Sequence, residues 1–203
     1  MANVIESDYQ GIQRTAENIR TMGEDLNREI AKAYQSVAEM HSSWYGIRYN
    51  TLVKDFNNLI PQINRMLELV VVQIPNTLDQ IAQNYSRMDT QPLSAKTRST
   101  LQKISDLSIS NDVGMRFLTG EVSEIQTKVS NNFKNSTNKM NEIESACGSM
   151  NWRSEAANAF TNEFKRIKSQ ISTEFENINS QFVKLMNQAI EDMEATEKAN
   201  TVQ

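Results

Sequence analysis

The sequence predicts an all-α protein made of two long antiparallel helical hairpins in tandem, packed as an elongated four-helix bundle. Three observations support this fold class. Only six glycines and three prolines interrupt 203 residues, and so few helix breakers favour long helices. Apolar residues recur at steps of three and four along four stretches, which places them on one face of a helix. Both tryptophans of the chain, Trp44 and Trp152, fall where one such stretch gives way to the next.

The first stretch, residues 5–44, has the most regular pattern. Its apolar positions alternate steps of four and three without a gap, and the positions between them are mostly polar, as in a coiled-coil seam. Ala16, Gly23 and Ala33 are small, so a partner helix can approach closely there. The stripe consists of Ile5, Tyr9, Ile12, Ala16, Ile19, Gly23, Leu26, Ile30, Ala33, Val37, Met40 and Trp44.

The second stretch, residues 52–88, is also helical but contains Pro61 and Pro75. A proline removes a backbone donor and clashes with the preceding turn, so we expect kinks or a break. Residues 67–72 between the two prolines are apolar on more than one face. They form either a thoroughly buried helix section or a second contact surface for the other half of the chain or another protein.

Residues 89–100 have the composition and proline placement of a linker. The spacing of Leu101, Ile104 and Leu107 suggests a short helix after it, and Ser110-Asn111-Asp112 is a candidate cap for the next long helix. We therefore divide the chain into a first hairpin over residues 1–90, the linker over 91–111, and a second hairpin over 112–203.

The third and fourth stretches, residues 115–150 and 160–193, again step mainly by three and four. A hairpin of such slender helices buries its apolar stripe poorly alone, whereas two hairpins side by side close a core. One chain then supplies both halves of a pseudo-dimer, and a homodimer with swapped hairpins is the alternative. The stripe of the fourth stretch is Phe160, Phe164, Ile167, Ile171, Phe175, Ile178, Phe182, Leu185, Ala189 and Met193.

The two hairpins read as a repeat although few residues are identical. A shift of 110 residues places Ile12 on Val122 and Ile19 on Val129, and it also places Ile5 on Met115. The same shift places Ile30 on Met140, Ala33 on Ile143, Val37 on Cys147 and Met40 on Met150, whereas the tryptophans align with a shift of 108.

Composition excludes several functions. Lys and Arg are scattered singly in a chain of net charge −4, so no basic stripe for nucleic acid is present. The single Cys147 forms no intrachain disulfide and is expected to be a buried apolar residue, and the single His41 forms no histidine cluster. Without a glycine-rich phosphate loop, a cysteine–histidine pair or a metal cluster, we expect no enzyme activity, cofactor or metal.

The sequence has no apolar stretch of the roughly 18 residues that a membrane span requires. Residues 1–8 lack the basic region and apolar core of a signal peptide. If the protein is secreted, we expect it to be made in the cytoplasm and exported without such a peptide.

The turn residues carry a resemblance to a known family. Trp44-Tyr45-Gly46 resembles the W-x-G signature of the WXG-hundred family, the helical-hairpin proteins related to the early secreted antigenic target of mycobacteria. The second turn resembles the fuller pattern W-x-G-x-A-A-x-x-F, with serine in place of the glycine. The first copy instead has Arg48, Tyr49 and Leu52 at the alanine and phenylalanine positions. In the second copy the matching residues are Trp152, Ser154, Ala156, Ala157 and Phe160. We expect Gly46 to suit a tight corner and to leave room for the indole.

A second motif extends the resemblance. Tyr85 and Asp89 match the Y-x-x-x-[DE] signal that type VII secretion systems read after the second helix of family members. Residues four apart share a helix face, so the two side chains are expected to form one composite surface. The equivalent positions of the second copy hold Met193 and Glu197, so the tyrosine is missing.

The resemblance implies a secreted substrate or secretion partner of a type VII system, with the system's membrane ATPase as its receptor. An alternative is an adaptor that escorts a helical segment of a co-secreted toxin to the machine. A membrane-active helical protein is a third possibility, which the lack of Lys and Arg enrichment on the polar faces disfavours.

Overall fold

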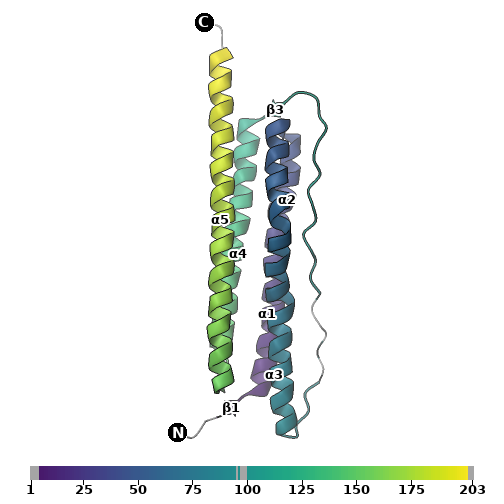
Figure 1. The fold of residues 1–203 in the computed structure, drawn as a ribbon, viewed down its shortest axis with the longest axis vertical. Helices are drawn as coiled ribbons and strands as arrows, with labels where there is room; N and C mark the ends of the chain where they lie inside the picture. Colours follow the sequence, from purple (N-terminus) through teal and green to yellow (C-terminus); the bar gives the residue numbers. More distant parts are fainter. Residues whose placement is uncertain (1–4, 95, 97–99, 201–203) are drawn as a thin grey trace.

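The computed structural model describes residues 5–94, 96 and 100–200 and has the predicted all-α architecture (Figure 1). Its helices lie roughly parallel to one long axis, and the two arms of each hairpin run in opposite directions. The helical elements are α1 (Tyr9–Glu39), a 3-10 turn η1 (Met40–Ser42), α2 (Ile47–Glu68), a π-helical segment η2 (Leu69–Gln73), α3 (Ile74–Met88), α4 (Thr119–Gly148) and α5 (Glu155–Asn200).

The centre of the bundle is the contact between α1 and α4, one helix from each hairpin. α3 packs on α1 and α5 packs on α4, whereas α2 and α5 make few contacts. One continuous core joins both hairpins, so the expected four-helix bundle closes within one chain. Its largest fully buried side chains are Ile12, Ile19, Leu26, Ile30, Met40, Tyr49, Ile63, Leu67, Leu78, Phe133, Phe175 and Phe182.

Two short antiparallel ladders cross-link the hairpins at opposite ends. β1 (Glu6–Ser7) precedes α1 and pairs with β4 (Trp152–Arg153) at the second turn. β3 (Arg116–Phe117) precedes α4 and pairs with β2 (Trp44–Tyr45) at the first turn. Ser7 thus faces Trp152 as Phe117 faces Trp44. In each half the strand before the first helix pairs with the turn strand of the other half. Such reciprocal use of equivalent surfaces is typical of a two-fold symmetric interface.

Burial follows the predicted repeat closely. Ile12, Ile19, Val122 and Val129 are all fully buried, as are the aligned pairs Ile30 with Met140 and Ala33 with Ile143. The prediction is wrong at the start of each hairpin, where Ile5 and Met115 are exposed because the chain there precedes the helix. It is also wrong at Leu185, which is exposed, while its neighbour Met186 is fully buried.

The two prolines behave differently. α2 continues without a break through Pro61, which is exposed. Upstream of Pro75 the α-helix gives way to η2, where the Ile74 N–H donates to the Leu69 carbonyl, one residue further back than in an α-helix. A π-helical turn of this kind changes the backbone bonding where a proline removes a donor. The expected interruption is therefore found at Pro75 and not at Pro61.

The π-helical segment lies against α1 at Gly23. A Cβ atom added to Gly23 would lie 3.2 Å from the Cα atom of Val71, so glycine permits this close approach of two backbones. Leu67, Val70 and Val71 are buried. The apolar section at 67–72 is thus mainly a buried helix section, which was the first of the two interpretations given above.

The predicted helix in the linker is wrong. Residues 100–112, which we call the strap, are extended and run along the outside of α2 toward β3 (Figure 1). Leu101, Ile104 and Leu107 still pack on the core, because a spacing of three also brings side chains to one side of an extended chain with three residues per turn, as in polyproline II. Side-chain amides of α2 hold the strap main chain in place of a helix's own hydrogen bonds.

The proposed helix cap at Ser110–Asp112 is also wrong, since α4 begins only at Thr119. The Asp112 carboxylate instead contacts the Ser110 hydroxyl and the His41 Nε2 atom, the latter at 2.6 Å. These hydrogen bonds lower the pKa of Asp112, with that from Ser110 the larger cause. The second hairpin accordingly starts at β3 (Arg116–Phe117).

Candidate functional site

The two turn tryptophans lie at opposite ends of the bundle, beside β3 and β1 respectively (Figure 1). Both are buried, with 4% of Trp44 and 7% of Trp152 exposed. Trp44 makes edge-to-face contacts with Tyr49 and Phe117, at centroid distances of 6.0 and 5.3 Å. Trp152 packs between Tyr85 and Phe160, at 6.3 and 5.9 Å. Each indole therefore contacts one aromatic residue of its own hairpin and one of the other hairpin.

The residue that precedes the following helix has a different structural role in each of the two turns. Gly46 has φ +121°, a conformation that other residues rarely adopt. A Cβ atom there would lie 3.2 Å from the Gly114 carbonyl oxygen, so the glycine leaves room for the chain before β3 and not, as expected, for the indole. Ser154 at the equivalent position accepts the Ala157 N–H at 3.0 Å and caps α5. Ala157 is buried and Phe160 half-buried, whereas Ala156 is exposed and makes no packing contribution of the expected kind.

The tail motif of the first hairpin meets the tryptophan of the second. The Trp152 Nε1–H donates to the Tyr85 hydroxyl at 3.1 Å. Asp89, at the C-terminal end of α3, is exposed and accepts the Tyr9 hydroxyl at 2.9 Å. Tyr85 is half-buried. The two motif residues are one helical turn apart, but Tyr85 bonds to Trp152 and Asp89 bonds to Tyr9. The candidate site thus consists of Tyr9, Tyr85, Asp89, Trp152 and Phe160, drawn from both hairpins.

Sequence reasoning missed Tyr9 as a member of this site. It falls on the apolar stripe of the first stretch, where a tyrosine reads as a core residue, and no local motif marks it. Its partner Asp89 is distant in the sequence, so only the antiparallel packing of α1 against α3 brings them together.

The Tyr9 hydroxyl is expected to ionise at unusually high pH. Its hydrogen bond to Asp89 raises the pKa above the ordinary 10.0, because the phenolate would face a carboxylate. A raised folded-state pKa means that the contact stabilises the fold below about pH 10 and is lost as pH rises through the Tyr9 pKa. The tyrosinate absorbance that disappears in Tyr9→Phe reports this titration, and Asp89→Asn should move it downward. Identical titrations in wild type and Asp89→Asn would contradict the contact.

The opposite end of the bundle carries a related but different arrangement. Arg48 and Asp192 form an ion pair at 2.5 Å between α2 and α5. Beside it a cavity of about 280 Å³ opens next to Trp44 and is lined partly by Leu185 and Ala189. No tyrosine stands at Met193, so the hydroxyl that Tyr85 offers to Trp152 has no counterpart at Trp44. α5 extends past the other helices at this end (Figure 1).

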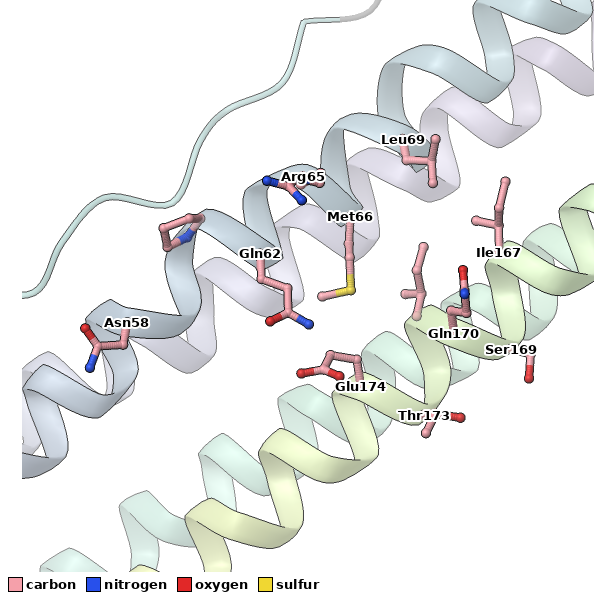
Figure 2. Close-up of a pocket in the computed structure, with 12 residues that line it drawn as sticks. Asn58, Gln62, Arg65, Met66, Leu69, Ile167, Ser169, Gln170, Thr173 and Glu174 are labelled. Atoms are coloured by element: carbon pink, nitrogen blue, oxygen red, sulfur yellow. The ribbon is translucent and has the colours of Figure 1, made fainter.

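A groove of about 800 Å³ lies between α2 and α5, which make few contacts with each other. Figure 2 shows Gln62 and Met66 of α2 pointing across it toward Gln170 and Glu174 of α5. Leu69 and Ile167 line it further along. The groove therefore combines apolar side chains with amides and one carboxylate.

Within residues 5–94, 96 and 100–200 no group of three or more His, Cys, Asp or Glu side chains is placed to hold a metal ion. Cys147 is buried as predicted, and burial raises the pKa of its thiol to about 12. At neutral pH this thiol is therefore protonated and a poor nucleophile. In the same part of the chain, no helix combines the length and apolarity needed to cross a bilayer.

Comparisons of the chain with models of known protein families, with curated proteins and with solved structures found no match.

Proposed function

We propose that the protein is a secreted substrate or secretion partner of a type VII secretion system, built as two fused hairpins of the WXG-hundred type. It acts through helical protein–protein contact, and the system's membrane ATPase recognises the end of the bundle at Tyr85 and Asp89. The observation that carries the proposal is the hydrogen bond from Trp152 to Tyr85. It joins the turn motif of one hairpin to the tail motif of the other.

Several features of this end support a recognition site. Arg87 and Met88, at variable positions within the motif, are exposed, with 76% of Met88 accessible. Asp89 is exposed at a helix end, where a receptor can reach its carboxylate. The indole and the Tyr9 hydroxyl fix the positions of Tyr85 and Asp89, and such preorganisation reduces the entropy that binding must overcome. The other end of the bundle lacks the tyrosine, so we expect one recognition site per chain.

The test is export from a bacterium that carries a type VII system. Asp89→Ala should abolish export and leave the fold unchanged, because the side chain is exposed. Tyr85→Phe keeps the ring against Trp152 but removes the acceptor of the indole N–H, so reduced export would assign a role to the hydroxyl. Secreted and cellular protein are measured by immunoblot, and folding by circular dichroism of the purified variants.

Arg87→Ala is the matched control, since Arg87 is an exposed residue of the same helix at a variable position between Tyr85 and Asp89. Its export should equal that of the wild type. Normal export of a folded Asp89→Ala, Tyr85→Ala double variant would disprove the signal assignment.

The groove between α2 and α5 favours a second candidate, an adaptor for a helical segment of a co-secreted protein. Met66, Leu69 and Ile167 offer a helix an apolar strip, and methionine suits binding surfaces that adapt to their ligand. Met66→Glu should then abolish co-purification of that protein without affecting export of the chain itself. Unchanged co-purification would rule out the groove as the binding site.

A further inference from the structure

The strap is held by a ladder of side-chain amides. Three asparagines of α2 lie seven residues apart, and each bonds both the N–H and the carbonyl of a single strap residue. The pairs are Asn64 with Ile104 at 2.8 and 2.9 Å, Asn57 with Leu107 at 2.8 and 2.9 Å, and Asn50 with Ser110 at 3.1 and 2.8 Å.

The ladder works because two repeats coincide. Seven residues of α-helix rise about 10.5 Å, and three residues of extended chain span about 9–10 Å. Every seventh residue of α2 therefore meets every third residue of a strap that runs antiparallel to it. These bonds involve only the main chain of the strap, so they would hold any extended segment in this register, as strand addition does at a sheet edge.

The strap side chains add a simple preference. Ile104 is buried, and Leu101 and Leu107 are half-buried against the core, whereas Ser105, Asp106 and Ser108 between them are exposed. The surface thus selects an apolar residue at every third position and leaves the intervening positions free.

α1 forms the second side of this surface. Its Asn27 Nδ2–H donates to the Gln102 carbonyl at 2.9 Å, and its Gln13 Nε2–H donates to the Ser94 carbonyl at 3.0 Å. The Asn27 Oδ1 atom is buried and has no hydrogen-bond partner within the part of the chain that the structure describes. A buried acceptor without a donor is costly, so the strap does not saturate the groups that face it.

We propose that this face of α1 and α2, which carries Asn27, Asn50, Asn57 and Asn64, is a peptide-binding groove that recognises main chain. The strap is its resident occupant. The ligand is an extended segment of a partner protein with an apolar residue at every third position, which replaces the strap. The ladder bonds main-chain groups that every extended segment carries, and the Asn27 Oδ1 atom remains open to a donor that the strap does not supply. The proposal does not depend on the secretion function.

The test uses the full chain with Ile104→Asp and Leu107→Asp, which place two carboxylates where the strap buries apolar side chains and so release it. The probe is a fluorescent peptide with the sequence of residues 100–112, and binding is measured by anisotropy. The variant should bind the peptide at least about a hundredfold more tightly than the wild type, in which the tethered strap competes at an effective concentration near the millimolar range.

Two controls isolate main-chain recognition. N-methylation of the peptide at Ile104 and Leu107 removes the N–H groups that the ladder accepts and should weaken binding at least tenfold, whereas N-methylation at Asp106 should change it little. In the protein, Asn57→Leu should weaken binding to a similar extent. Asn58→Leu, an exposed neighbour that faces the groove toward α5, should leave it unchanged.

The proposal is overturned if the released variant does not bind the peptide, or if N-methylation at the ladder positions has no effect. Hydrogen exchange shows whether the strap amides are released. Continued protection despite two carboxylates would also overturn it, because the groove would then not select apolar side chains. A doubled mass in light scattering without added peptide would assign the groove to the strap of a second copy instead.

Discussion

Asp79→Ala is expected to lower the free energy of unfolding by about 2–4 kcal/mol, because it leaves a buried guanidinium without its main partner. Asp79 on α3 and Arg20 on α1 form an ion pair in which only 12% and 8% of the side chains are exposed. Arg20 keeps a longer contact to Glu17 at 3.4 Å, which limits the loss. Urea unfolding monitored by circular dichroism measures the change.

The control is Asp25→Ala. Asp25 pairs with Arg28 on the surface of α1, the helix that carries Arg20, and such surface pairs contribute about 1 kcal/mol or less. The double variant Arg20→Met, Asp79→Leu should regain most of the stability, because an apolar pair of similar size avoids the desolvation of two charges. An Asp79→Ala protein within about 1 kcal/mol of wild type would show that this pair is not a buried one in solution.

Gly46→Ser should destabilise the protein by about 2–3 kcal/mol, although the second turn carries serine at the equivalent position. The backbone at Gly46 has φ +121° and ψ −174°, a region that is nearly restricted to glycine. The new Cβ atom would also press on the Gly114 carbonyl oxygen. Thermal unfolding of the purified variant measures the effect.

The reciprocal change, Ser154→Gly, should cost only a few tenths of a kcal/mol, because glycine is also an acceptable N-cap residue. Equal losses for the two changes would mean that the turns are conformationally alike, contrary to their different backbone angles.

Helix positions and core residues were predictable from the sequence because they depend on local periodicity. Ile12 and Val122, or Ile30 and Met140, are buried because steps of three and four fix the face of a helix regardless of its partner. The prediction failed at Leu185, because the buried stripe of α5 steps by four from Phe182 to Met186 and not by three to Leu185.

The strap and the complete candidate site were not predictable in this way. A spacing of three in Leu101, Ile104 and Leu107 fits one helix turn and an extended chain equally well. The asparagines of α2 decide in favour of the extended chain, because they bond the main chain of the strap. Their seven-residue spacing is visible in the sequence, but the sequence does not show which segment they bond. Tyr9 likewise meets Asp89 only through tertiary packing, and the two-residue ladders are too short to leave a pattern of alternation.

The exchange of strands between hairpins has a consequence for how the chain folds during synthesis. β1 pairs with β4, and α1 has its most extensive contact with α4. The first hairpin therefore leaves the ribosome with the α4-facing part of α1 uncovered, and this part stays exposed until the second hairpin has been made. Long-range pairing of this kind slows folding and exposes apolar surface to aggregation. A nascent chain stalled before α4 should thus bind chaperones until translation resumes, and native structure should form only near the end of synthesis.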